Sequence, residues 1–335
     1  MKKSLINSLK LAATGGVSLA MIACSGASEN AAATSEAAPQ DVAEQSTAPA
    51  PEEAAPALSP LEVSVLGDWR SDENKARDAY RNPLETLEFF ELGADETVVE
   101  ISPGGGWYTQ IIAPYIKSGG GTYIAAGSGN TQRDEAFLTA FGDADLYGDV
   151  QLGILGDTIA PDSADTVLTF RNMHSVMRSD SEAKLFSEVF KALKPSGIFG
   201  IVSHRLPSAM EQDPRASTGY VHQDYVIQLA QDAGFELVAS SEINANPADK
   251  ADHPFGVWTL PPVSFSGSED RPAPEGFDPE VYKQIGESDR FTLKFMKPAD
   301  SPAYQEAVMD EAGADMEEAA TEETTPKGDD APRGS

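Results

Sequence analysis

The sequence predicts an α/β protein with a doubly wound, mostly parallel sheet in a single domain. Two observations support this prediction. Strand and helix patterns alternate along the chain from residue 82 to residue 240, and the strands are continuous apolar runs, which is typical of strands covered by helices on both faces. Right-handed crossovers leave few other topologies, and ligands of such sheets bind beyond the carboxyl ends of the strands.

The elements are predicted in order from their start signals, stop signals and apolar runs. Asn82-Pro83 opens the first helix, because proline is favoured at an early helical position, and Gly93 ends it. The helix predicted at 181–193 is closed by Lys194-Pro195-Ser196-Gly197. Further helices are expected over about 107–116, 131–141 and 222–233, and strands at 97–101, 122–126, 150–155, 165–170, 198–203, 235–240 and 291–296.

The charge of the chain is strongly negative and is concentrated at its two ends. The sequence has 54 acidic and 24 basic residues, a formal net charge of −30, which argues against nucleic acid as a partner, since phosphates need a basic surface. Residues 24–60 and 299–335 contain few large apolar residues and cannot bury enough surface to fold. We therefore expect a disordered tether at 24–60, one domain at 61–298 and a disordered acidic tail at 299–335.

The N-terminus is typical of an export signal. Lys2 and Lys3 precede an apolar stretch that ends at residue 23 and is too short for a permanent membrane span. Met21-Ile22-Ala23-Cys24 resembles the bacterial lipobox, which implies a signal peptide at 1–23 and lipidation of Cys24. Ser25 after the cysteine resembles lipoproteins passed to the outer membrane, so we expect a lipid anchor on the periplasmic face of the envelope. The alternative is an ordinary signal peptide with an incidental cysteine.

The strongest local motif is a glycine-rich turn after the strand at 97–101. Ser102-Pro103-Gly104-Gly105-Gly106 lets the backbone approach a ligand, because a glycine has no Cβ in the way. The dinucleotide fingerprint would place a third glycine where Thr109 stands, and the phosphate-loop motif is absent, which disfavours an oxidoreductase. The plainer alternative is a tight strand-to-helix turn without a ligand.

Several short motifs, in their order, point to one superfamily. They are Arg81-Asn82-Pro83 with Thr86-Leu87, residues 100–109, 193–197, Ser203-His204-Arg205, Ala233-Gly234-Phe235, Asn246-Pro247 and residues 256–262. On these motifs the segment from about 65 to 298 resembles class I S-adenosylmethionine-dependent methyltransferases, more narrowly a family of predicted bacterial methyltransferases of unsettled substrate. The resemblance implies a Rossmann-like seven-stranded sheet with an antiparallel last strand.

The resemblance also implies a cofactor site for S-adenosylmethionine. Glu100 and the turn of Pro103, Gly104, Gly105 and Gly106 would hold the methionine part and the ribose edge. Asp157 would lie near the adenine amino group, unless it is only a polar turn or helix cap. Asn172 and His174 would line the methyl-transfer cavity, and the alternative for each is a hydrogen-bonded loop residue.

Two positions depart from the pattern of the superfamily. The acid that usually ends the second strand is missing, and Ala125-Ala126-Gly127 stands there instead, with Ser128 or Asn130 as neutral substitutes. Ser203 stands where related sequences tend to have Asp. The first departure bears on cofactor affinity, and the second bears on the catalytic role of that strand end.

Candidate catalytic residues follow the fourth and fifth predicted strands. His174 and His204 could each act as a base, if the acceptor needs one, and Tyr108 could line the site. The four histidines lack the compact spacing of a metal site, so we expect no metal. The long segment 244–290 is expected to cover the ligand edge as a lid or acceptor pocket, with Asp252, His253, Trp258 and Arg271 as candidate contacts, or else to pack against the sheet.

Two functions remain open from the sequence. The first is a methyltransferase that acts on a small-molecule or envelope acceptor. The second is a non-catalytic periplasmic binding protein on a methyltransferase scaffold, which the missing strand-end acid and the expected export from the cytoplasm would fit.

Overall fold

The computed structural model describes residues 57–127 and 129–299. The predicted signal peptide, Cys24, the tether up to residue 56, Ser128 and the acidic tail from residue 300 lie outside the described residues. Within the described part of the chain, no helix is long and apolar enough to cross a membrane.

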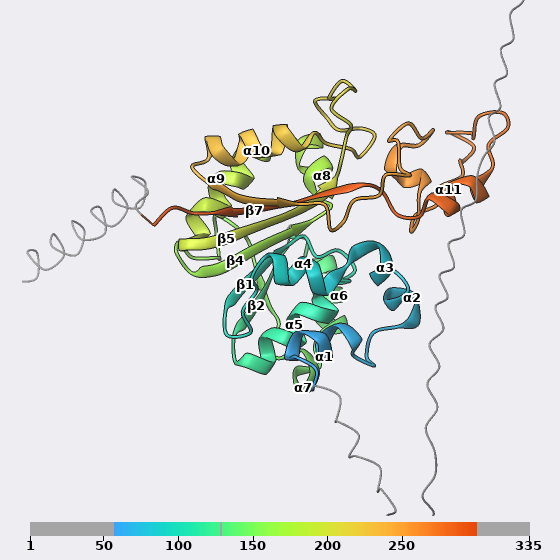
Figure 1. Cartoon of the computed structure of the whole chain (residues 1–335). Coiled ribbons are helices and arrows are strands. Elements are labelled where there is room, and N and C mark those ends of the chain that lie inside the picture. The colour runs from blue at the N-terminus through green and yellow to red at the C-terminus, as the bar shows by residue number, and fades with distance from the viewer. Residues whose placement is uncertain (1–56, 128, 300–335) are drawn as a thin grey trace, which may run out of the picture. The chain divides into compact units, whose positions relative to one another are not determined.

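The domain is built on one seven-stranded sheet with the strand order β3-β2-β1-β4-β5-β7-β6. β7 is antiparallel to both of its neighbours, and the other pairings are parallel. The predicted fold class is therefore confirmed, including the antiparallel last strand (Figure 1). The strands are β1 (Thr97–Ile101), β2 (Thr122–Ala126), β3 (Gln151–Gly153), β4 (Ala164–Phe170), β5 (Leu193–His204), β6 (Glu236–Ser241) and β7 (Arg290–Met296).

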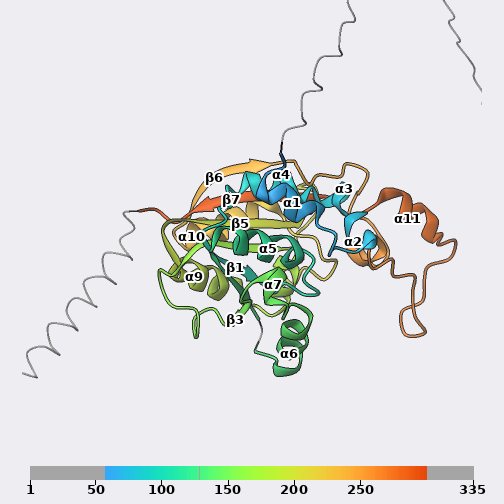
Figure 2. The same ribbon diagram turned by 90° about the horizontal axis from the view of Figure 1, so that it is seen from below.

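Helices cover both faces of this sheet. Figure 1 shows α9 and α10 on one side of the strands and α1, α4 and α5 on the other. Figure 2 shows the sheet from below. β6 lies towards one edge of the sheet and β3 towards the other, and α6 lies beyond β3. The helices are α1 (Pro60–Leu66), α2 (Asp72–Lys75), α3 (Asp78–Arg81), α4 (Pro83–Phe89), α5 (Thr109–Gly119), α6 (Thr131–Ala140), α7 (Ala144–Tyr147), α8 (Met173–Arg178), α9 (Glu182–Ala192), α10 (Gln223–Asp232) and α11 (Pro279–Ile285).

Two apolar clusters, one on each face, hold the layers together. On the α9 and α10 face, Phe186 and Phe199 lie in the first cluster. On the α4 and α5 face, Leu87, Phe90 and Ile111 lie in the second. All five side chains are fully buried, and burial of such a side chain contributes roughly 1.5–3 kcal/mol. The sheet is thus a rigid frame that fixes the ends of its strands.

The expected turn at Lys194-Pro195-Ser196-Gly197 is wrong, because these residues belong to β5. The backbone N–H of Ser196 donates to the Lys297 carbonyl (2.8 Å), and that of Lys297 donates to the Gly197 carbonyl (3.0 Å). A register shift in the β4–β5 pairing absorbs the irregular stretch. The strand therefore begins directly at the end of α9.

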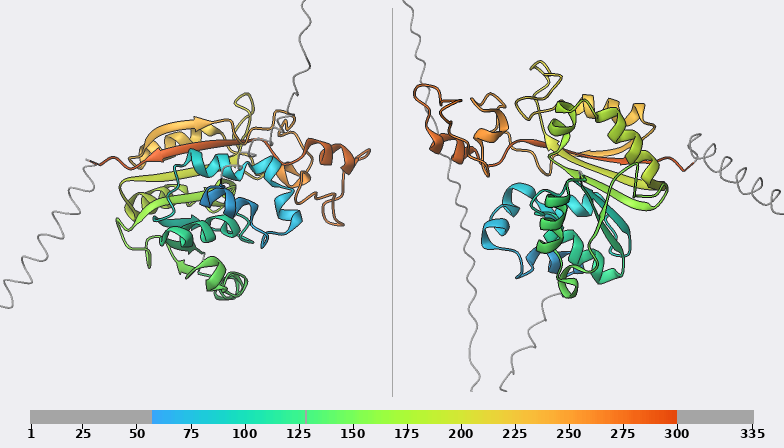
Figure 3. Two further views of the ribbon diagram at one scale, coloured as in Figure 1. Left: turned by 60° about the horizontal axis from the view of Figure 1, so that its bottom comes forward. Right: turned by 180° about the vertical axis from the view of Figure 1, so that it is seen from behind.

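The segment between β6 and β7 packs against the residues between β5 and α10, at the carboxyl edge of the parallel strands. It contains a 3-10 helix, η1 (Gly256–Thr259), and α11. A small apolar cluster joins Tyr220, Ala251 and Val257, with Trp258 packed against it. Figure 3 shows this segment extending from the end of the sheet at which β7 starts.

Candidate active site

The glycine turn between β1 and α5 presents open backbone. A Cβ placed on Gly104 or on Gly105 would meet no atom within 4 Å. Gly104 also has a φ of +60°, a conformation that glycine adopts without strain. A ligand can therefore approach the backbone at these two residues.

Gly106 has a different task. A Cβ on this residue would lie 2.1 Å from Cζ of Phe141. The missing Cβ of Gly106 thus leaves space for the Phe141 ring of the core rather than for a ligand. The predicted cofactor role of Gly106 finds no support in this geometry.

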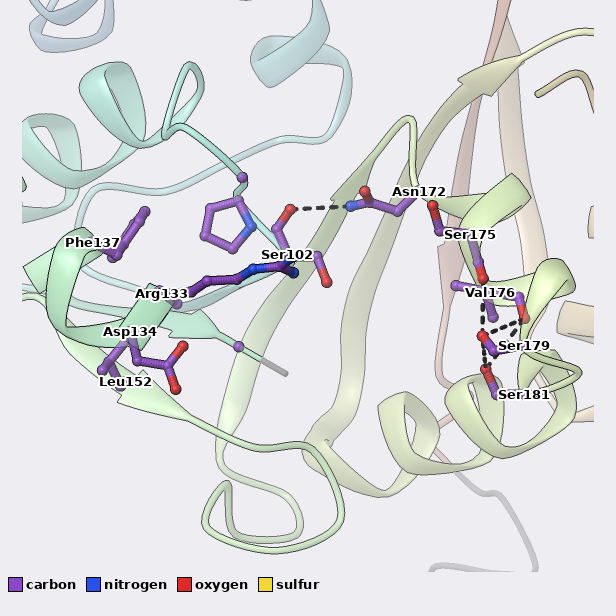
Figure 4. Close-up of a pocket in the computed structure, with 14 residues that line it drawn as sticks. Ser102, Arg133, Asp134, Phe137, Leu152, Asn172, Ser175, Val176, Ser179 and Ser181 are labelled. Carbon is purple, nitrogen blue, oxygen red and sulfur yellow. Dashed lines mark hydrogen bonds between the residues drawn. The ribbon is translucent and has the colours of Figure 1, made fainter. Parts of the chain in front are cut away.

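A cavity of about 550 Å³ opens on this turn. Ser102, Pro103 and Gly104 form one part of its lining. Another part consists of residues from the end of β4 to the start of α9, namely Asn172, Ser175, Val176, Ser179 and Ser181. Figure 4 shows these two parts facing the side chains of α6, among them Arg133 and Asp134. The volume is within the range of small-ligand sites. We call this space the first cavity.

Asp134 places a carboxylate beside the end of β2, which has no acid of its own. A Cβ on Gly127 would lie 2.9 Å from Oδ1 of Asp134, so the carboxylate occupies the space beside that strand end. Asn130, one of the suggested substitutes, instead caps α6 by accepting a hydrogen bond from the Arg133 N–H (3.1 Å). Asp134 was not among the predicted site residues, because it reaches the strand end from the helix that follows.

Phe137 and Leu152 add apolar surface to the first cavity.

Asn172 joins the turn to the end of β4, since its amide donates to the carbonyls of Ile101 (2.9 Å) and Ser102 (3.3 Å). Its predicted place at the cavity thus agrees with the geometry, although the contact with a ligand remains a prediction.

Glu100 points into the protein and lines neither cavity described in this section. Its carboxylate accepts hydrogen bonds from Thr109 Oγ1 (3.0 Å) and from the Tyr123 hydroxyl (2.6 Å). Burial raises the pKa of Glu100 to about 7, against the lowering effect of these two hydrogen bonds and of the Arg171 charge. In this structure the residue joins β1 to α5 and β2.

A second cavity of about 400 Å³ lies on the other side of the turn. It shares Ser102, Pro103, Gly104 and Asn172 with the first cavity, so the two adjoin. Its further lining comes from the helices before β1, from the rest of the turn and from the ends of β4 and β5, namely Asn74, Arg77, Arg81, Gly105, Trp107, Phe170, Arg171 and His204.

His204 contributes a neutral imidazole to the second cavity. Its Nδ1 lies 2.6 Å from Oγ of Ser288, so Nε2 is the nitrogen left for a ligand. Burial, together with nearby cationic groups, holds the pKa of His204 well below its usual range. The ring therefore stays uncharged near neutral pH.

His174 lies in α8, with its ring centroid 5.7 Å from that of His204. Burial lowers the pKa of His174 to about 4, and its Nδ1 has no hydrogen-bond partner among the described residues. His174 does not line either cavity. The structure thus brings both predicted histidines together, with His204 nearer to the turn.

Tyr108 is a core residue. Its ring stacks on Phe170 with 3.6 Å between centroids, and its hydroxyl donates to the Arg81 carbonyl (3.3 Å). Burial raises the pKa of Tyr108 above its usual value. The hydroxyl is therefore no acid or base near neutral pH, and it lines neither cavity.

The remaining predicted contacts lie away from both cavities. Asp157 is exposed in the turn after β3, and its contact with adenine stays a prediction. Ser203 is fully buried, and its hydroxyl lacks a partner among the described residues. Within the 244–290 segment, His253 forms a hydrogen bond with Asp249, and Arg271 lies over the Phe255 ring. Trp258 instead contacts the His174 ring of α8, and Asp252 is exposed.

No cluster of three or more His, Cys, Asp or Glu residues that could hold a metal ion is found in the described part of the chain. The glycine turn and the two cavities that adjoin it form the candidate site.

No family model and no curated protein matches the chain. Among solved structures, a methyltransferase from Aquifex aeolicus described as S-adenosylmethionine-dependent is 14% identical, over 72% of this chain and 100% of that one, with a TM-score of 0.42. A geranyl diphosphate methyltransferase in complex with S-adenosylmethionine is 12% identical, over 70% and 94%, at 0.45. The [4+2]-cyclase SpnF is 16% identical, over 71% and 92%, at 0.46. At this level of similarity, the function has to be argued from the site itself.

Proposed function

We propose that the chain is a methyltransferase that uses S-adenosylmethionine and acts on a small-molecule or envelope acceptor. The observation that carries the proposal is the open turn at Gly104 and Gly105, whose residue Gly104 lines the first cavity together with Asp134. This combination offers backbone groups to one end of a ligand and a hydrogen-bond acceptor to sugar hydroxyls.

The residues present fit this cofactor in three respects. The turn at Gly104 and Gly105 would receive the methionine part, because a Cβ would otherwise fill that space. Asp134 would accept hydrogen bonds from the ribose. Phe137 and Leu152 would supply apolar surface for the adenine. When bound, the cofactor supplies a methyl group on a sulfonium sulfur, whose bond to carbon breaks as the acceptor gains the methyl group.

The chain itself mainly has to position the methyl donor and the acceptor, and such positioning contributes much of the rate of a methyl transfer. Asn172 holds the turn against β4, on the boundary of the two cavities. The second cavity adjoins the turn and is the natural place for the acceptor. In the tautomer in which Nδ1–H donates to Ser288 Oγ, Nε2 of His204 can accept a proton from the acceptor, and the lowered pKa of the ring suits an acceptor whose proton is itself acidic.

The cofactor site is tested by calorimetric titration of S-adenosylmethionine and S-adenosylhomocysteine into the purified full-length chain. Asp134→Asn removes a charged acceptor of hydrogen bonds and should weaken binding about tenfold or more. Glu135→Gln is the matched control, because it makes the same change on the next, exposed residue of α6 and should bind like the wild type.

Absence of heat from a well-folded wild-type sample would contradict the enzyme proposal. It would favour the binding protein on a methyltransferase scaffold. Equal affinities of Asp134→Asn and Glu135→Gln would move the ribose contact away from α6.

We further propose that Cys24 carries a lipid and holds the protein on the periplasmic face of the outer membrane, as the lipobox-like sequence suggests. In cells fed a labelled fatty acid, the wild type should carry the label and fractionate with outer membranes, and Cys24→Ser should do neither. A variant that still sediments with the outer membrane would contradict the anchor.

A further inference from the structure

We propose that the second cavity binds an acceptor with an oxyanion, a carboxylate or a phosphate, through Arg77, Arg81 and Arg171. The part played by this anion as methyl acceptor rests on the proposed function. The binding of the anion itself rests only on the cavity and its arginines.

The second cavity carries an excess of positive charge. Arg77, Arg81 and Arg171 all line it, although the chain as a whole has a net charge of −30. Glu287 is the carboxylate that balances this cluster, and it is already shared. It accepts from Nε of Arg77 (2.8 Å) and from Nε of Arg81 (2.9 Å), and also from Nη2 of Arg290 (2.5 Å).

Arg81 holds hydrogen-bond donors that no described residue uses. Its side chain is only 1% exposed, and neither Nη1 nor Nη2 has a partner among the described residues. The guanidinium lies over the Trp107 ring, 4.6 Å from its centroid, while Nε is fixed by Glu287. Buried charged donors without partners are costly, and a bound oxyanion would satisfy them.

Arg171 adds a cation whose guanidinium has no hydrogen-bond or ion-pair partner among the described residues. It follows β4 directly, with a φ of +61°, a left-handed conformation that is uncommon for a residue other than glycine. No hydrogen bond or ion pair of its guanidinium is present within residues 57–127 and 129–299, although its backbone N–H donates to the Val202 carbonyl (2.7 Å). Burial, with the charge of Arg290, lowers the pKa of Arg171 to about 10, so the group remains charged near neutral pH.

The position of these cations suits an acceptor rather than the cofactor. They lie in the second cavity, whereas Arg133 and Asp134 lie in the first, and the two cavities meet at Ser102, Pro103, Gly104 and Asn172. His204 lines the same cavity as the arginines. A ligand held by its oxyanion would thus lie beside both the turn and the imidazole, which is the arrangement that methylation of a second group on the ligand requires.

The test titrates inorganic phosphate and malonate, each alone, into the full-length chain at low salt and follows binding by calorimetry. We expect binding that Arg171→Gln weakens about tenfold, since a charge-assisted pair is lost. Arg77→Gln, whose side chain is partly exposed, provides a second variant in case the first folds poorly. Arg133→Gln in the first cavity and Arg178→Gln on the exposed end of α8 should bind like the wild type.

Each outcome bears on the proposal. Preference for phosphate assigns a phosphorylated acceptor, and preference for malonate assigns a carboxylic acid. Loss of anion binding in Arg133→Gln but not in Arg171→Gln or Arg77→Gln, or no anion binding at all by a folded wild type, overturns the proposal.

A parallel titration of S-adenosylmethionine separates this proposal from the proposed function. Cofactor binding without anion binding refutes only the anionic acceptor. Anion binding without cofactor binding supports the oxyanion site and refutes the methyltransferase.

Discussion

Substitutions at the neighbouring residues Gly105 and Gly106 should affect different properties: the first ligand binding, and the second the stability of the domain. Gly105→Ala places a methyl group in open space, so we expect a free energy of unfolding close to that of the wild type. The same methyl group narrows the approach to the backbone, and S-adenosylmethionine should bind about tenfold more weakly.

Gly106→Ala should have the opposite effect on stability, because the new Cβ meets Phe141 and the residue has a φ of +74°. Overpacking and backbone strain together predict a loss of about 2–4 kcal/mol in urea unfolding. If the two variants were equally stable, the packing assigned to Gly106 would be wrong.

Glu100 makes the stability of the domain depend on pH. In the folded chain the pKa of Glu100 is raised to about 7, above the ordinary glutamate value of 4.5, so the side chain holds its proton over a wider range of pH. Since the folded state then binds more protons than the unfolded state, the contribution of Glu100 to stability falls as the pH rises from about 4.5 through 7. The difference between the two pKa values corresponds to a change in the free energy of unfolding of about 3 kcal/mol at most.

Glu100→Gln removes this titration and keeps a side chain of the same shape beside Thr109 and Tyr123. In urea unfolding at about pH 5 and about pH 8, the variant should gain stability relative to the wild type towards the higher pH. Glu135→Gln, on an exposed helix, should show no such gain. A difference that does not change with pH would contradict a buried, titrating Glu100.

At the level of elements, the sequence predicted what local pattern determines. The strands at 97–101 and 122–126 have the predicted bounds, because each is a continuous apolar run that ends at a glycine-rich or polar stretch. β5 begins earlier than predicted, since the hydrogen bonds of Ser196 and Gly197 with Lys297, directly after the last strand, override the turn preference of Pro195-Ser196-Gly197. Helices such as α1 and α8 are short, and their apolar repeats span too few turns to be recognised.

The α1 helix nevertheless had a sequence signal. Ser59 and Glu62 form a capping box, with Pro60 at the first helical position. Such a signal predicts a helix start, and it also lies close to the predicted domain boundary at residue 61.

The predictable part of the candidate site lies just past the ends of predicted strands. The turn at 102–105 and Asn172 were found, because strand ends of this fold class point to a site. Asp134 was missed, since its side chain reaches the end of β2 from the following helix. The cluster of Arg77, Arg81 and Arg171 was missed because separate elements bring it together. Side-chain direction also escaped prediction, and Glu100 is the clearest case.

At the level of the whole molecule, the place of the last strand sets the order in which the domain can form. β7 lies between β5 and β6, and among the described strands it is the only neighbour of β6. A ribosome makes residues 290–296 after every other strand of the sheet, so a nascent chain that stops short of them leaves β6 without a partner and one edge of β5 uncovered. For a chain that is exported as we propose, this late closure favours passage through the membrane before folding.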